Sequence, residues 1–174
     1  DLYQFWDPIP ANCITLAAMD FINGCLLEQM PDVRDMKLSD ASKPWPYFLR
    51  NKTGCSAAYA FMLFPKHLNL NLSVYIQVIE DVILITNLVN DVLSFHKEYL
   101  AGETNNYLSN RSRVTQRTMI DTLQDAVDDT LAAHARVTKL LKNTDAALPW
   151  KRYVNGYLAF HFTLNRYRLH ELGF

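Results

Sequence analysis

Residues 72–100 read LSVYIQVIEDVILITNLVNDVLSFHKEYL. The first part, residues 72–88, is strongly apolar, and this run predicts a buried helix. We expect the helix to begin after Asn69 or Asn71, either of which could cap it, and to reach about Leu100. A helix that is apolar on most sides must be surrounded by other elements, so the fold is expected to be organised around it.

A narrow polar stripe interrupts the C-terminal end of this predicted helix. At about 100° of rotation per residue, Ser94 lies roughly 40° and Glu98 roughly 80° round the helix from Asn90. Lys97 falls roughly 20° to the other side of Asn90, within the same sector. Polar side chains on a buried helix cost free energy unless a partner satisfies them. A metal ion with an anionic ligand would be such a partner.

The chemistry of the stripe favours a hard cation. Asn90, Ser94 and Glu98 offer three oxygen ligands along one helix face, and Mg²⁺ prefers oxygen ligands. One carboxylate carries too little charge to hold Mg²⁺ tightly, so a diphosphate would have to supply further oxygens. Lys97 could then pair with that diphosphate. The alternative is a helix end that emerges into solvent, where its amide and hydroxyl groups are hydrated.

The rest of the sequence predicts an all-α fold, because no strand-like alternation or internal repeat occurs. Prolines, glycines and polar clusters separate the apolar segments, and residues 103–113 are expected to form a polar loop. The long helices are expected at about residues 11–30, 47–63, 71–100, 115–141 and 150–172. These five helices are expected to pack around one shared core.

The second of these helices contains an unusual interruption at Thr53-Gly54. A glycine inside a helix costs about 1 kcal/mol relative to alanine, so a kink or break is expected there. One interpretation is a seam of small residues that lets two helices approach closely. The other is a broken helix that presents Arg50 and free backbone carbonyls to a pocket.

Composition excludes several classes of protein. The chain has 174 residues, enough for one domain, and a formal net charge of −1, which gives no electrostatic basis for binding nucleic acid. The three cysteines show no CxxC spacing and are interpreted as thiols of a reducing, cytoplasmic compartment. The apolar run at residues 72–88 is interrupted by polar side chains, so no membrane span is expected.

Two charged clusters in the second half of the chain are interpreted as solvent-facing. The first is basic and could instead be a phosphate patch: Arg111, Arg113 and Arg117. The second is acidic and could instead bind a metal: Asp121, Asp125, Asp128 and Asp129.

Four segments of the chain resemble segments of a known family, and they occur along the sequence in the same order as in that family. Residues 90–98 resemble N-D-x-x-S-x-x-x-E, the second metal-binding motif of class I terpene cyclases, and the likeness is strongest to fungal sesquiterpene cyclases of the trichodiene synthase type. Residues 20–29 resemble the family's helix before the kinked one. Residues 47–54 resemble its diphosphate-sensing arginine and broken helix. Residues 165–168 resemble its C-terminal Arg-Tyr diphosphate clamp.

The resemblance implies a class I terpenoid synthase helical bundle, of which residues 1–174 would be the C-terminal portion of a single α-helical domain. The fold would be incomplete at the N-terminus, because the family's other metal site, an Asp-rich helix, has no match here and is expected upstream of Asp1. One of three Mg²⁺ ions would be held by Asn90, Ser94 and Glu98. The diphosphate would be contacted by Arg50, Lys97, Arg166 and Tyr167.

The implied activity is Mg²⁺-dependent ionisation of farnesyl diphosphate, followed by cyclisation of the carbocation and release of diphosphate. Phe21, Tyr59 and Phe95 are candidates for the cavity wall, and this segment alone is expected to be inactive. The alternative is a non-catalytic helical protein of the same fold that binds a diphosphate ligand or a protein partner. A chain-elongating prenyltransferase fits less well, because such enzymes have aspartate-rich motifs at both metal sites. Whether the protein is a homodimer is left open.

Overall fold

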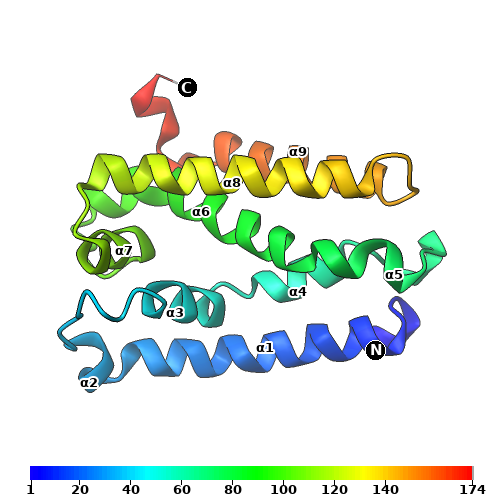
Figure 1. The fold of residues 1–174 in the computed structure, drawn as a ribbon, viewed down its shortest axis with the longest axis horizontal. Coiled ribbons are helices and arrows are strands. Elements are labelled where there is room, and N and C mark those ends of the chain that lie inside the picture. The colour runs from blue at the N-terminus through cyan, green and yellow to red at the C-terminus, as the bar shows by residue number, and fades with distance from the viewer. Residues whose placement is uncertain (174) are drawn as a thin grey trace.

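The computed structural model describes residues 1–173 (Figure 1). It confirms the predicted all-α class, since all secondary-structure elements in this range are helices. The α-helices are α1 (Pro8–Gln29), α2 (Pro31–Arg34), α3 (Trp45–Thr53), α4 (Ser56–Met62), α5 (Leu72–Tyr75), α6 (Ile79–Leu100), α7 (Tyr107–Thr115), α8 (Met119–Leu141) and α9 (Ala147–Thr163). The 3-10 turns are η1 (Leu2–Gln4), η2 (Lys66–Leu68), η3 (Ile76–Val78), η4 (Asn165–Tyr167) and η5 (Leu169–Leu172).

The helices form a bundle around α6 (Figure 1). Helix α1 lies along one side, α3 and α4 follow one another along it, and α4 packs on α6. Helix α8 packs along α6, and α9 contacts both. The main core between these helices includes the fully buried Ala60, Val82 and Val137. The prediction of a central helix is therefore confirmed, although η3 separates α5 from α6.

The predicted break in the second helix is also confirmed. Helix α3 ends at Thr53, Cys55 adopts a left-handed conformation with φ 51°, and α4 begins at the next residue. A Cβ atom at Gly54 would overlap Oδ1 of Asn87 and lie 2.5 Å from Nη1 of Arg50. Gly54 itself has an ordinary φ of −91°, so close approach to α6, rather than backbone freedom, explains a glycine here.

The expected polar loop at residues 103–113 is wrong in its second half, where α7 forms. Asn106 caps this helix, because its side-chain oxygen accepts a hydrogen bond from the backbone N–H of Ser109 at 2.9 Å. Leu108 and Val114 are buried and anchor the helix to its neighbours. Two apolar anchors among many polar residues were too weak a periodic signal to predict this helix.

The two charged clusters turn out to be partners of one another. Arg111 of α7 pairs with Asp129 of α8, and Arg117 of the connecting loop pairs with Asp125 of α8, each at 2.8 Å. Helix α8 begins at Met119, later than the predicted residue 115. Arg117 and Asp129 are exposed, as the solvent-facing interpretation predicted, whereas Arg111 and Asp125 are half-buried.

The last helix ends earlier than expected. Leu164 is extended, with φ −88° and ψ 120°, so the residues after α9 turn away in η4 and η5. The tail is tied back to α6, since Glu171 lies 3.0 Å from Nε2 of His96 and accepts a hydrogen bond from Arg168 at 2.7 Å. Arg166 and Tyr167 consequently lie in a tight turn and not on a helix.

Two helical stretches, Pro8–Gln29 and Leu72–Leu100, are long and apolar enough to cross a membrane by length and composition alone. This corrects the expectation that no such run occurs. Half of the apolar window of Leu72–Leu100 is buried inside the bundle, as in the core helix of a soluble protein. Such helices are weak evidence of a membrane span, and the packing of α6 explains its apolar character.

Candidate active site

The polar stripe of α6 forms a hydrogen-bonded group centred on Glu98. The buried hydroxyl of Ser94 donates to Oε1 of Glu98 at 2.6 Å, and Nζ of Lys97 lies 2.9 Å from the same oxygen. The other carboxylate oxygen accepts from the side chain of Asn106, the cap of α7, at 3.1 Å. The structure therefore brings together Ser94, Lys97 and Glu98, as the spacing predicted, and adds a residue from the next helix.

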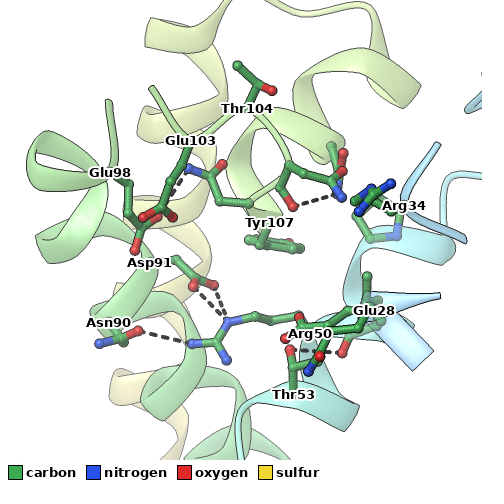
Figure 2. Close-up of a pocket in the computed structure, with 16 residues that line it drawn as sticks. Glu28, Arg34, Arg50, Thr53, Asn90, Asp91, Glu98, Glu103, Thr104 and Tyr107 are labelled. Atoms are coloured by element: carbon green, nitrogen blue, oxygen red, sulfur yellow. Dashed lines mark hydrogen bonds and ion pairs between the residues drawn. The ribbon is translucent and has the colours of Figure 1, made fainter. Parts of the chain in front are cut away.

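Arg50 reaches from α3 across to α6 (Figure 2). Its Nε donates to both carboxylate oxygens of Asp91, and its Nη2 donates to Oδ1 of Asn90 at 3.3 Å and to the backbone carbonyl of Asn87 at 3.3 Å. Burial raises the pKa of Asp91 to about 6, although the charge of Arg50 opposes that shift. This role of Asp91 is not predictable from the sequence, because nothing in it pairs residues 41 positions apart.

The amide of Asn90 has a second partner, His161 of α9. The two side chains meet at 3.1 Å between Nδ2 of Asn90 and Nε2 of His161. The other ring nitrogen of His161, Nδ1, lies 2.7 Å from the backbone carbonyl of Tyr157. Burial lowers the pKa of His161. Apart from its place in an aromatic-rich segment, His161 carries no signal in the sequence that indicates a role.

Tyr167 lies against His161, with 4.4 Å between the ring centroids. The tyrosine is buried, and burial raises the pKa of its phenol, whereas the nearby charge of Arg166 lowers it. Arg166 is exposed in the same turn. Tyr167 therefore lies beside Asn90, whereas no hydrogen bond or ion pair among residues 1–173 connects Arg166 to this group.

Two cavities meet at this group. The first, of about 660 Å³, is lined mainly by polar and charged residues, among them Asn90, Glu98, Glu28 and Arg34 (Figure 2). The second, of about 540 Å³, is lined by aromatic side chains of α4, α9 and η4. Arg50 and Asn90 line both cavities. These two residues therefore stand between a polar compartment and an aromatic one.

The aromatic cavity is built mainly by α9. Its aromatic lining consists of Tyr59, Tyr153, Tyr157, Phe160 and Tyr167. The rings of Tyr153 and Tyr157 are stacked, 5.6 Å apart and 9° from parallel. Their hydroxyls are anchored on Thr86 of α6, where the phenol of Tyr157 donates to the backbone carbonyl at 2.9 Å and that of Tyr153 lies 2.6 Å from the side-chain hydroxyl.

Of the three aromatic residues expected in the cavity wall, only Tyr59 lines this cavity. Phe21 is exposed on α1, and Phe95 packs against a second small core cluster around Leu88 and Leu108. The other two expectations are therefore wrong. The break after Thr53 does border the cavity, because Gly54 belongs to its wall.

The ligand atoms that the stripe offers are oxygens, which is the type of ligand that Mg²⁺ prefers. Within residues 1–173, no group of three or more His, Cys, Asp or Glu side chains is arranged to hold a metal ion. The proposed set of Asn90, Ser94 and Glu98 is not such a group, because Glu98 is its only carboxylate and the other two ligands are an amide and a hydroxyl. A side-chain amide, a hydroxyl and a carboxylate are hard oxygen ligands, and Ser94 and Glu98 already lie within hydrogen-bond distance. A bound anion would have to complete such a site.

The all-α fold is consistent with that of a terpene synthase. The family model described as trichodiene synthase (TRI5) matches residues 1–173. The chain therefore belongs to the trichodiene synthase family, as the resemblance in the sequence indicated.

Curated relatives agree with this family. The chain is 36% identical over 168 residues to terpene synthase BipA of Cochliobolus sativus, which covers 95% of this chain and 52% of that protein. It is 33% identical over 174 residues to monoterpene synthase 25 of Postia placenta, and the match covers 98% of this chain and 52% of that protein. It is 32% identical over 180 residues to the (E)-beta farnesene synthase of Metarhizium brunneum, and the match covers 99% of this chain and 53% of that protein. The chain thus spans about half the length of these relatives.

Proposed function

We propose that the protein containing this chain is a Mg²⁺-dependent terpene cyclase that ionises a prenyl diphosphate and cyclises the resulting carbocation. The observation that carries the proposal is the position of Arg50 and Asn90 between a polar and an aromatic cavity in a member of this family. A prenyl diphosphate has the same two-part character, with a charged head and an apolar tail. Both cavities fall within the usual size of small-molecule sites.

The diphosphate would bind at the polar side. Three basic groups and one phenol are proposed to contact it: Arg50, Lys97, Arg166 and Tyr167. Arg50 is already oriented by Asp91, and a guanidinium can make paired hydrogen bonds to phosphate oxygens. Lys97 is paired with Glu98 and would have to share or exchange that partner.

Mg²⁺ would be held by Asn90, Ser94 and Glu98, and when bound it would supply positive charge to the departing diphosphate. The C–O bond of the allylic diphosphate would break with its electron pair leaving on the diphosphate oxygen. The positively charged side chains would stabilise the negative charge of this leaving group. We retain the expectation of three ions for the complete site.

The aromatic cavity would receive the allylic cation. Tyr153 and Tyr157 present stacked rings whose hydroxyls are held by Thr86, so their faces are fixed before substrate enters. Aromatic faces attract cations, and an apolar wall excludes water until a proton is lost or a water molecule is captured. This arrangement supports cyclisation in preference to simple hydrolysis.

Farnesyl diphosphate is the proposed substrate. A relative named as (E)-beta farnesene synthase supports it, whereas a relative named as a monoterpene synthase supports a shorter chain. The cytoplasm is retained as the expected location. We also retain the proposal that residues 1–174 form the C-terminal portion of a single helical domain, since the relatives are about twice as long.

The test uses the full-length protein that contains this sequence, with Mg²⁺ and either farnesyl or geranyl diphosphate. Gas chromatography with mass spectrometry should detect a terpene hydrocarbon or alcohol. Asn90→Ala and Glu98→Ala should reduce turnover to background, whereas Gln124→Ala, on the exposed face of α8, should not change it. Retained turnover in both site variants would refute the metal assignment. Binding of inorganic diphosphate without turnover would favour the non-catalytic alternative.

A further inference from the structure

The side-chain amide of Asn90 is held from both sides. Its oxygen, Oδ1, accepts a hydrogen bond from Nη2 of Arg50 at 3.3 Å. Its nitrogen, Nδ2, lies 3.1 Å from Nε2 of His161. Arg50 can only donate to Asn90, so the tautomer of the neutral His161 ring decides whether Nε2 can accept a hydrogen bond from the other side.

The surroundings of His161 determine where its ring proton lies. Nδ1 is 2.7 Å from the backbone carbonyl of Tyr157, and a carbonyl oxygen can only accept a hydrogen bond. Nδ1 must therefore carry the proton, which leaves the lone pair of Nε2 free to accept from Asn90. The ring is almost fully buried and packs edge-on against Tyr157, so it is not free to turn over.

These contacts exclude the reversed amide. Rotating the Asn90 amide by half a turn would place its NH₂ group against the Arg50 guanidinium and its oxygen against the lone pair of His161. Both contacts would be repulsive. The oxygen of Asn90 is thereby kept beside Arg50, and the second of its two lone pairs remains available to a metal ion.

We infer that His161 is a positioning residue that holds the Asn90 amide with its oxygen toward the proposed metal site. The inference rests on the proposed function, because it takes Asn90 as a metal ligand. His161 does not touch the proposed ligands Ser94 or Glu98 in any hydrogen bond of the described residues, so its effect on the metal passes through Asn90.

The same histidine supports the proposed diphosphate-binding turn. Its ring lies 4.4 Å from that of Tyr167, centroid to centroid, and is tilted by 42°. One buried side chain of α9 therefore contacts both a proposed metal ligand on α6 and a proposed diphosphate ligand in η4. This explains why a polar side chain is retained among the aromatic residues of α9 at the cost of burying it.

The experiment measures Mn²⁺ binding to the full-length protein by electron paramagnetic resonance, with inorganic diphosphate present as the anion. His161→Phe keeps the ring size but has no acceptor, and His161→Gln restores an acceptor oxygen. Loss of a residue that orients a metal ligand typically weakens metal binding about 10- to 100-fold. We expect that loss for His161→Phe, a smaller loss for His161→Gln, and no further loss when His161→Phe is added to Asn90→Ala.

Two results would overturn the inference, and they are distinguishable. Wild-type Mn²⁺ affinity in His161→Phe, with weakened binding in Asn90→Ala, would refute the role of His161 alone. Unchanged affinity in Asn90→Ala would refute the metal site itself and the inference with it. If His161→Phe fails to fold, ¹⁵N-histidine NMR of the wild-type protein decides: the proton must lie on Nδ1, and a proton on Nε2 refutes the inference.

Discussion

Arg50 donates from Nε to both carboxylate oxygens of Asp91, at 2.7 and 2.9 Å, and so joins α3 to α6. Both side chains are largely buried, with 13% and 12% of their surfaces exposed. Each charge has been removed from water, and each depends on the other to offset that loss. The pair therefore fixes the position of Arg50 in the absence of a ligand.

We expect Arg50→Met to lower the free energy of unfolding by about 3–5 kcal/mol, because it leaves the Asp91 carboxylate buried without its partner. Arg50→Met combined with Asp91→Leu should recover most of this loss, since no charge is then left unpaired. Urea denaturation of the wild-type, both single variants and the double variant measures the coupling. Strictly additive losses would contradict a direct interaction between the two side chains.

Gly54→Ala tests the close approach between the helix break and α6. The new methyl group would overlap Oδ1 of Asn87 and crowd the Arg50 guanidinium, so we expect a loss of about 1–3 kcal/mol in the free energy of unfolding. Gly156→Ala is the matched control. No atom lies within 4 Å of a Cβ at Gly156, and this helical position should instead gain about 0.5–1 kcal/mol. Equal effects of the two changes in urea denaturation would show that packing at Gly54 does not matter.

Asn106 has two roles that substitution can separate. It caps α7 through its oxygen and donates to Glu98 through its nitrogen. Asn106→Ser keeps a capping oxygen, whereas Asn106→Ala removes it at a cost of about 1 kcal/mol in the free energy of unfolding. Both variants lose the side-chain amide nitrogen that donates to Glu98, so both should weaken Mn²⁺ binding. Normal Mn²⁺ affinity in Asn106→Ser would show that Glu98 does not need this contact.

The pKa of His161 predicts how stability depends on pH. Burial lowers this pKa below the ordinary value of 6.5, so the folded state binds the proton less tightly than the unfolded state. Stability should therefore fall as the pH drops below about 6.5, and this part of the fall should end below the folded-state pKa. The variant His161→Gln should lack this part of the pH-dependent loss of stability. Urea denaturation at pH 7.5, 6.5 and 5.5 should show a shallower decline in the variant, and parallel declines would exclude His161 as the cause.

The sequence predicted those parts of the site that lie along one helix. Asn90, Ser94 and Glu98 fall on one face of α6 because helical rotation alone places them there. The break at Gly54 was predictable for a similar reason, since glycine disfavours a helix interior locally. Local rules are sufficient for features of this kind.

Contacts between distant helices were not predictable in the same way. Asn90 and His161 are 71 positions apart, and their meeting depends on how α9 packs against α6. Helix α7 was missed because its stability comes from a cap and two buried apolar side chains more than from a periodic pattern. Tertiary packing decided both outcomes, and a single sequence contains no direct record of it.

Helix α1 has an apolar stripe that faces away from the core. Ile14 and Ala17 are buried, but Leu16, Met19, Ile22 and Leu26 are at least half exposed. The four exposed residues fall within roughly 120° of one another round the helix. Exposed apolar stripes of this kind commonly mark surfaces that another element covers.

We expect this 174-residue chain, produced alone, to self-associate through α1 and to give no product from farnesyl diphosphate. Self-association would bury the apolar stripe, and inactivity follows because the chain offers one carboxylate at the proposed metal site and spans about half the length of its relatives. Analytical ultracentrifugation should show oligomers that Leu16→Glu with Leu26→Glu disperses. Ile120→Glu on α8, where the side chain is already 80% exposed, should leave them intact. A monomeric wild-type chain, or product formation by the chain alone, would contradict this prediction.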